Sequence, residues 1–214
     1  MNNYELLKDI RGFYHNQLKK SMENKAIDLL EKYEITSDLI DTYMLGLNSL
    51  EDNLEQYLIE KGYSNEEISN LPLFVKCDSV LVNATNEMIM IPVNNLDGQC
   101  CAFLGVKEAQ DGILLTQLYK CSEDNIVFGL DNYSESSQVA YLCSEPFSVL
   151  KKNINKEDNE TVYCFLTQPL ISCVEANMFQ HIGISHIALR LSSSCDIANI
   201  MLLLDYEFNV SVFQ

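Results

Sequence analysis

Short apolar runs alternate with helix-like stretches over the last third of the chain, and this alternation limits the folds open to it. The runs are rich in β-branched residues, which predicts strands at 139–144, 161–167, 184–191 and 208–214. Apolar residues recur at helical spacing between them, which predicts helices at 146–154, 169–182 and 195–206. Alternation of this kind is typical of a parallel sheet with helices packed on it.

Helical spacing dominates the first 70 residues or so instead. Within them, Ser49 is expected to cap a helix that ends before Gly62, and Ser64 with Glu67 predicts a capping box at the start of a short helix. The pattern changes near Pro72, where apolar runs become short and β-branched. These runs predict an antiparallel sheet with strands at 79–82, 88–93, 100–106, 112–118 and 125–130.

Two features fix the expected organisation around this sheet. The segment 94–98 predicts a hairpin turn in which Gly98 takes positive φ. The polar segment 132–138 (NYSESSQ) is the best internal boundary. We therefore expect a mixed α+β and α/β chain of two parts: helices followed by an antiparallel sheet in residues 1–132, then a parallel-sheet α/β subdomain in 133–214.

The charge balance argues against nucleic-acid binding. The chain has 31 acidic and 14 basic residues, a formal net charge of −17. Proteins that grip nucleic acid neutralise phosphates with Lys and Arg, so we do not expect direct binding. Six of the basic residues lie between Lys8 and Lys32, where any phosphate contact is expected.

The cysteines and the N-terminus indicate a reducing compartment. None of the eight cysteines forms a C-x-x-C pair, and several lie in apolar runs, so free buried thiols are expected rather than disulfides or a zinc site. The N-terminus lacks the apolar stretch of a signal peptide, and no run is long enough to span a membrane. We predict a cytoplasmic protein with no membrane association; the sequence does not fix its oligomeric state.

An ordered set of short motifs resembles the RNA-polymerase core of DnaG-type bacterial primases. No single motif is specific, but their order and approximate spacing hold over most of the chain. They are 13–18 (FYHNQL), 43–47 (YMLGL), 58–64 (LIEKGYS), 90–93 (MIPV), 97–98 (DG), 102–105 (AFLG) and 128–131 (FGLD). The resemblance implies a DNA replication protein whose second part has a Toprim fold.

That fold implies three acidic residues for nucleotidyl transfer: a Glu after the first strand, and an Asp-x-Asp after the third that binds divalent metal. Oxygen ligands of this kind hold Mg²⁺. Glu145 fits the first position, as catalytic residue and metal ligand. Ser192 and Ser194 stand where the aspartates are expected, so both carboxylates are replaced by hydroxyls. Asp196 is either a displaced ligand or a helix N-terminal residue.

A second registration puts Gln168 at the Glu position, and it lacks the aspartate pair too. The family's basic residues are also missing, because their positions fall near Met88, at Val106 and in the stretch 112–118, which has no lysine. No cofactor is expected, with Mg²⁺ required only if the chain is active.

Three functions follow from these observations. The favoured one is a catalytically degenerate, primase-like replication protein, a pseudoenzyme that acts through protein–protein interaction with a helicase or a primase. The first alternative is an active metal-dependent primase or nucleotidyltransferase that uses Glu145 and Asp196 in a rearranged site. The second is an acidic nucleic-acid mimic that inhibits a DNA-binding protein.

Overall fold

The computed structural model describes residues 4–20, 25–49, 53–77, 80–85, 87–110, 112, 114–122, 126–156, 159–168, 170–190 and 196–213. The chain divides into two compact units. The first consists of residues 1–93 and 100–123, and the second of residues 94–99 and 124–214, so the hairpin turn at 94–99 groups with the second unit. None of the described helices is both long and apolar enough to cross a bilayer.

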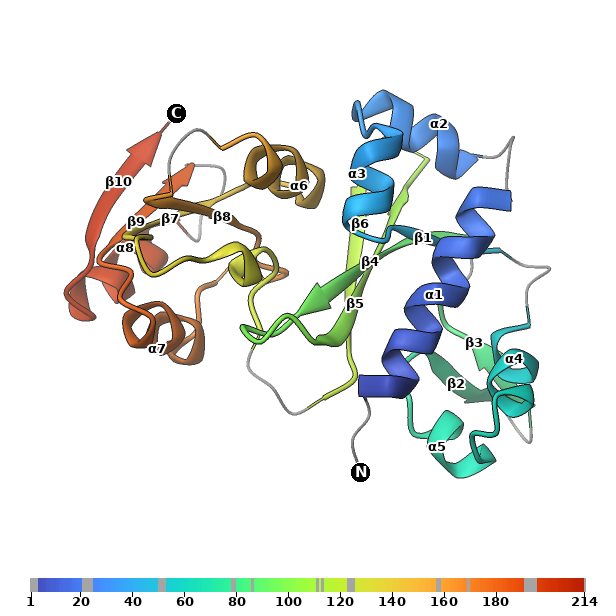
Figure 1. The fold of residues 1–214 in the computed structure, drawn as a ribbon. Coiled ribbons are helices and arrows are strands. Elements are labelled where there is room, and N and C mark those ends of the chain that lie inside the picture. Colours follow the sequence, from blue (N-terminus) through green and yellow to red (C-terminus); the bar gives the residue numbers. More distant parts are fainter. Residues whose placement is uncertain are drawn as a thin grey trace. The chain divides into compact units, whose positions relative to one another are not determined.

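Helices and an antiparallel sheet make up the first unit, as the sequence predicts (Figure 1). Its four-stranded sheet has the order β1-β4-β5-β6, and β2 and β3 form a separate antiparallel pair. The helices are α1 (Tyr4–Lys20), α2 (Lys25–Lys32), α3 (Ser37–Thr42), α4 (Leu54–Glu60) and α5 (Asn65–Ser69). The strands are β1 (Gly46–Asn48), β2 (Phe74–Cys77), β3 (Val80–Asn83), β4 (Met88–Asn94), β5 (Cys100–Glu108) and β6 (Leu114–Lys120).

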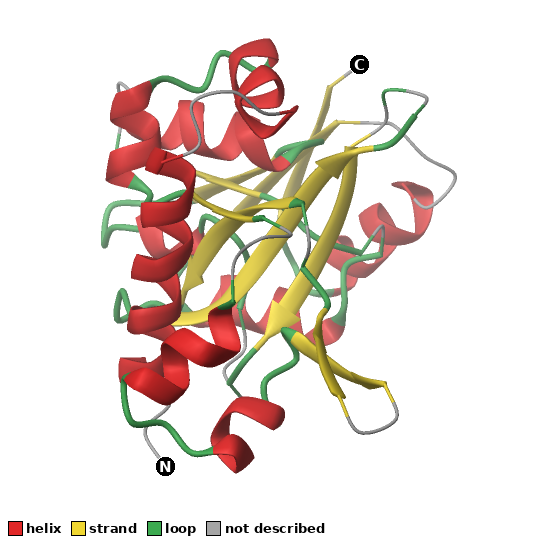
Figure 2. Ribbon diagram, turned by 90° about the vertical axis from the view of Figure 1, so that its right-hand side faces the viewer, coloured by secondary structure: helices red, strands yellow, loops and turns green. Residues whose placement is uncertain are grey.

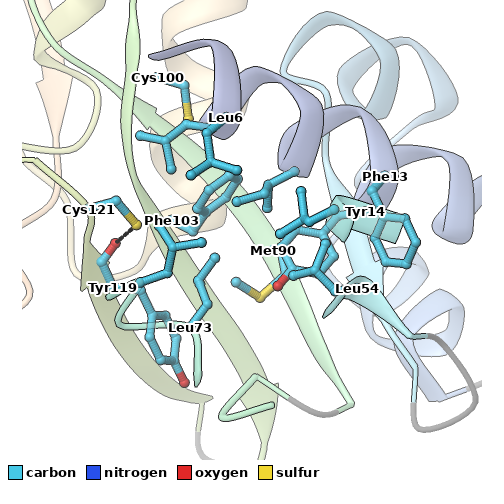
Figure 3. Close-up of a cluster of buried hydrophobic side chains, with 14 of the residues drawn as sticks. Leu6, Phe13, Tyr14, Leu54, Leu73, Met90, Cys100, Phe103, Tyr119 and Cys121 are labelled. Carbon is cyan, nitrogen blue, oxygen red and sulfur yellow. Dashed lines mark hydrogen bonds between the residues drawn. The ribbon is translucent and has the colours of Figure 1, made fainter. Parts of the chain in front are cut away.

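The core of this unit lies between α1 and the sheet. Figure 2 shows helices along one side of the strands of the first unit. Tyr14 is almost fully buried; its ring meets that of Phe103 edge-on at 5.7 Å, and its hydroxyl bonds to Thr85 Oγ1 at 3.2 Å. Figure 3 shows Tyr14 and Phe103 among leucine, methionine and cysteine side chains of the same cluster. Gly46 lets α1 and β1 touch, since a Cβ there would lie 2.4 Å from Cβ of Tyr14.

The second unit is a parallel sheet with helices, which confirms the predicted alternation. All pairings in its sheet, of order β10-β9-β7-β8, are parallel. Its strands are β7 (Val139–Leu142), β8 (Thr161–Cys164), β9 (His186–Arg190) and β10 (Asn209–Phe213). Its helices are α6 (Pro146–Ile154), α7 (Cys173–His181), α8 (Asp196–Asp205) and the 3₁₀ turn η1 (Leu130–Asn132).

Side-chain alternation separates the two faces of this sheet. Every second residue, including Ala140, Val162, Ile187 and Leu189, enters the core that also contains residues of α7 and α8. Tyr141 and Tyr163 belong to the other face, where Lys152 of α6 lies over both rings, with Nζ 4.4 and 5.0 Å from their centroids. Asn153 of α6 pairs with both the N–H and the carbonyl of Tyr163.

Local signals place several helix starts and turns correctly. The predicted capping box of Ser64 and Glu67 is present, whereas α7 begins later than the predicted residue 169, at a second capping box between Ser172 and Glu175. The turn at 94–98 joins β4 to β5, with Gly98 at φ +75°. The six described free cysteines include five that are buried, and Cys173 is exposed.

Three sequence predictions are wrong. Asn53, not Ser49, caps α4, because its Oδ1 accepts the Gln56 N–H. The run 125–130 is not a strand among its described residues: Phe128 forms a single bridge to Phe165, and the chain then turns into η1 at Gly129, whose φ is +92°. The first 70 residues are not all helical, since they include β1.

Candidate functional site

The candidate site lies at the carboxyl ends of two neighbouring parallel strands, β7 and β9. Leu142 of β7 pairs with Leu189 of β9. Glu145 follows Leu142 by three residues, just as Ser192 follows Leu189. Carboxyl ends of parallel strands meet at one edge of a sheet, where ligands bind in open α/β folds. Ser192 and Ser194 themselves lie outside the described residues.

Glu145 is held at the start of α6. It occupies the N-cap position in extended conformation, and Pro146 fills the first helical turn, where its missing N–H costs nothing. The carboxylate is partly buried, and Oε1 accepts a hydrogen bond of 2.8 Å from the Ser148 hydroxyl. The positive end of the α6 dipole favours a negative charge at this place. Helix geometry therefore accounts for Glu145 without a ligand.

Asp196 begins α8, and its side chain is buried with 9% exposed. An acidic residue in a first helical turn is stabilised by the helix dipole. Within the part of the chain that the structure describes, no three His, Cys, Asp or Glu side chains gather at metal-binding distance. Gln168, the alternative to Glu145, is exposed in the loop after β8, which is an edge strand next to β7 alone.

The ligand set that the family resemblance implies, Glu145 with Ser192 and Ser194, is a poor match to Mg²⁺. Mg²⁺ is bound in proteins through carboxylates that supply charge, with waters completing the octahedron. Here Glu145 already accepts a hydrogen bond from Ser148, and the sequence offers hydroxyls at the two remaining positions. A hydroxyl supplies an oxygen but no charge, so this set is weak for a divalent cation.

Half of the six basic residues between Lys8 and Lys32 have acidic partners. Between Lys8 and Lys32, three lysines form ion pairs with carboxylates, and Lys61 forms a fourth pair nearby. The pairs are Lys8–Glu5 at 3.6 Å, Lys19–Asp41 at 2.7 Å, Lys61–Asp9 at 3.1 Å and Lys32–Glu108. A phosphate would have to compete with these carboxylates.

Two of the three regions matched to the family's other basic residues, near Met88 and at Val106, belong to the core, whereas the third, 112–118, includes Leu115, which is 46% exposed. Met88 is 5% exposed, and its sulfur accepts a hydrogen bond of 3.4 Å from the Tyr119 hydroxyl. Val106 is fully buried. Met88 and Val106 therefore contribute packing instead of phosphate contacts.

The motif at 128–131 packs against β8 of the second unit. Gly129 packs against β8 so closely that a Cβ would lie 2.3 Å from the Tyr163 carbonyl oxygen. Asp131 accepts 2.9 Å and 3.2 Å hydrogen bonds from the side-chain amides of Asn94 and Asn132. Burial raises the pKa of Asp131, although these amides oppose the rise.

The Asp131–Asn94 pair is a feature that the sequence patterns do not predict. Its members are 37 residues apart in sequence, and no local pattern joins them. The one available signal is the position of Asp131 at the end of the motif 128–131, which the family resemblance already marks.

The fold and these motifs define the class as a two-unit protein with a helical and antiparallel-sheet first unit and a parallel-sheet second unit. The family model for the N-terminal domain of the DNA primase catalytic core matches residues 13–131. The chain belongs to this family.

Solved primase structures share the fold over nearly the whole chain. The Aquifex aeolicus primase (zinc-binding and RNA polymerase domains) matches with a TM-score of 0.76 at 16% identity, over 98% of this chain and 53% of its own. The RNA polymerase domain of Mycobacterium tuberculosis primase DnaG, in complex with double-stranded DNA, matches with a TM-score of 0.78 at 13% sequence identity, and the match covers 100% of this chain and 74% of that one. The E. coli primase catalytic core matches with a TM-score of 0.72 at 14% sequence identity, and the match covers 98% of this chain and 71% of that one.

The chain thus spans about half of the Aquifex aeolicus chain that it resembles. The comparison with curated proteins gives no match. At these identities the structural likeness establishes the fold, and it includes the parallel-sheet unit beyond residue 131.

Proposed function

We propose that this chain is a DNA primase-like, replication-associated protein that acts by binding other replication proteins and does not synthesise primers. The observation that carries the proposal is the pair Ser192 and Ser194, which stands where the family resemblance puts a metal-binding Asp-x-Asp. Without those two carboxylates, Glu145 is the one acidic residue left at the expected positions.

The strand arrangement supports this choice of positions. The first and third strands of the predicted Toprim part are β7 and β9, and these are neighbours in the sheet. The registration through Gln168 would start from β8, which does not touch β9. The bounds 1–132 for the first part and 133–214 for the Toprim part belong to the proposal.

Charge supports the proposal from a second direction. Primer synthesis needs contacts to a template and to a triphosphate, and Lys and Arg provide them. In this chain Met88 and Val106 are buried and apolar, the stretch 112–118 has no Lys or Arg, and three of the N-terminal lysines are paired with carboxylates. Partner proteins such as a helicase or a primase remain suitable ligands, and a cytoplasmic location is part of the proposal.

Metal binding is the first test. Mn²⁺ is titrated calorimetrically into the wild type, Glu145→Gln and the double variant Ser192→Asp/Ser194→Asp. We expect no saturation of the wild type up to about millimolar metal, and tighter binding in the double variant because it restores two charged ligands. Saturable wild-type binding that Glu145→Gln removes would favour the alternative of an active nucleotidyltransferase.

Partner binding is the second test. The replicative helicase and the active primase of the same cell are each immobilised, and this chain is passed over them. We expect saturable binding to one of them, with no template-dependent nucleotide incorporation by this chain alone. Incorporation that is lost in Glu145→Gln would overturn the proposal, and so would failure to bind either protein.

The net charge of −17 favours one further candidate, an acidic mimic that occupies the nucleic-acid site of a basic protein. Such binding depends on long-range attraction and weakens strongly with salt. If this function is correct, the chain should compete with DNA for binding to the basic partner at about 50 mM salt, and this competition should disappear by about 300 mM. A salt-independent interaction that leaves DNA bound would exclude it.

A further inference from the structure

The last helix, α8, exposes a row of apolar side chains on the side away from its core. Ile197, Met201 and Leu204 are 72%, 62% and 56% exposed. On the opposite side of the same helix, Asn199 and Leu203 are buried. Surface helices normally place polar residues outward, and a helix that is apolar all round is typical of one covered on both sides. We define Ile197, Met201 and Leu204 as the α8 stripe.

The spacing within the α8 stripe suits a helical partner. Steps of four and then three residues place the three side chains along one seam, in the order d, a, d of a heptad. A seam of this kind takes the knobs of one facing helix, whereas a flat sheet or an extended peptide does not follow it. Its side chains project from a regular helix whose position is fixed by buried contacts on the other face.

The segment before α7 holds α8 in place on its buried side. The Ile171 N–H donates a 2.8 Å hydrogen bond to Asn199 Oδ1, which ties the segment before α7 to the middle of α8. A partner helix along α8 therefore meets a supported surface.

The charges around the stripe select the partner. Residues 196–214, which contain α8, have no Lys or Arg and three acidic residues, Asp196 at the start of the helix, Asp205 at its end and Glu207 just beyond it; the nearest basic residue before them in the sequence is Arg190. Arg190 follows Leu189 by one position, so it belongs to the sheet face opposite α8. A second copy of this chain would bring like charges together, whereas Lys and Arg beside an apolar seam complement them.

We infer that the α8 stripe binds a basic amphipathic helix of a partner protein, one that presents apolar residues at a and d positions flanked by Lys or Arg. The inference rests on the binding function proposed above and gives that function a surface. In this inference the partner helix binds to α8 of the second unit, and the sheet edge near Glu145 takes no part in that binding.

The probe is a synthetic peptide of three heptads with Leu at a and d and Lys at e and g, labelled for fluorescence anisotropy. A matched peptide has Glu at e and g. The protein variants are Ile197→Gln/Met201→Gln, which makes the stripe polar without adding charge, and Leu115→Gln, which alters a 46% exposed leucine on β6. Circular dichroism and urea unfolding establish that each variant is folded.

We expect saturable binding of the Lys peptide, at least about ten-fold tighter than that of the Glu peptide at low salt. The double variant should lose about ten-fold or more in affinity, and Leu115→Gln should stay within about two-fold of wild type. Equal binding of both peptides, or equal loss in Leu115→Gln, would overturn the inference. So would dimers in sedimentation that the double variant abolishes while no peptide binds, since the occupant would then be a second copy.

The same variants separate this inference from the function on which it rests. If the helicase or primase binds wild type and double variant equally, the stripe is not the recognition surface, although the proposed function stands. If the peptide binds at the stripe and neither replication protein binds, the surface stands and the proposed function falls.

Discussion

Gly129 occupies a place that no other residue fits without cost. Its φ of +92° strains any L side chain, and a Cβ would lie 2.6 Å from Val149 Cγ1 as well as against the Tyr163 carbonyl. We expect Gly129→Ala to lower the free energy of unfolding in urea by more than about 3 kcal/mol, from backbone strain plus the forced displacement of β8.

Gly62 provides the matched control for Gly129. It has a similar φ of +95°, but a Cβ at this position would meet nothing within 4 Å. Gly62→Ala therefore reports the backbone contribution alone, about 1 kcal/mol. Equal losses in the two variants would show that close packing around Gly129 adds nothing.

The raised pKa of Asp131 makes the free energy of unfolding depend on pH in a defined direction. Burial raises its pKa in the folded state, so the folded chain holds this proton more tightly than the unfolded chain, whose Asp titrates near 3.8. The carboxyl therefore favours folding below that pH and opposes it as pH rises through the folded pKa. Asp131→Asn keeps an acceptor for Asn94, and we expect it to stabilise the protein at pH 7 by about 1 kcal/mol, with no gain at about pH 3.

Asp9 supplies the control of opposite sign. Burial raises its pKa, but hydrogen bonds from Lys61 and Tyr63 outweigh burial, and the net pKa is lowered. Its contribution is present above the unfolded pKa and is lost as pH falls through the folded one. Asp9→Asn should therefore destabilise at pH 7 and be neutral at about pH 3, and a parallel response of the two variants in urea unfolding would contradict both assignments.

Among the elements, the start of α7 depends on one side chain. The Ser172 hydroxyl accepts the Glu175 N–H at 3.3 Å, and the Glu175 carboxylate accepts the Ser172 N–H at 2.7 Å. We expect Ser172→Ala to cost about 1 kcal/mol of unfolding free energy, because it leaves a helix N–H without its acceptor. Ser69→Ala, whose hydroxyl donates only to the Glu66 carbonyl, should stay within about 0.5 kcal/mol. A Ser172→Ala effect no larger than this control would contradict the cap.

Local sequence signals predict these elements where the chemistry is local. The capping box of Ser64 and Glu67, the turn glycine Gly98 and the strand–helix alternation after residue 138 are predicted, and all depend on neighbours along the chain. The three-residue strand β1 escapes prediction because so short a run carries no period, and its pairing with β4 is long-range. The run 125–130 resembles a strand in composition, but Gly129 turns the backbone within it.

The candidate site is predictable in part for the same reason. Pro146 after Glu145 signals a helix start at a strand end, and the structure places Glu145 there. The Asn94–Asp131 pair joins a hairpin turn to η1, and only the folded arrangement brings them together. Ser192 and Ser194 lie outside the described residues, so their role stays a prediction.

At the scale of the whole molecule, net charge decides how the chain meets a polyanion. A charge of −17 repels DNA at long range, and the lysines of α1 and α2 that could form a local patch are largely paired with Glu5, Asp41 and Glu108. We expect no shift of a labelled single-stranded oligonucleotide at about 150 mM salt, measured by anisotropy up to about 10 µM protein.

If the chain does bind single-stranded DNA, the salt dependence of binding would show which contacts are responsible. If the N-terminal lysines bound phosphate in spite of the net charge, the logarithm of the binding constant would fall linearly with the logarithm of salt concentration. Lys20→Glu/Lys25→Glu would then reduce that slope, whereas Lys151→Glu in α6 would leave it unchanged. A flat salt dependence with weak binding would instead indicate contacts to bases, for which the Tyr141–Tyr163 pair at 5.5 Å beneath Lys152 is the first place to substitute.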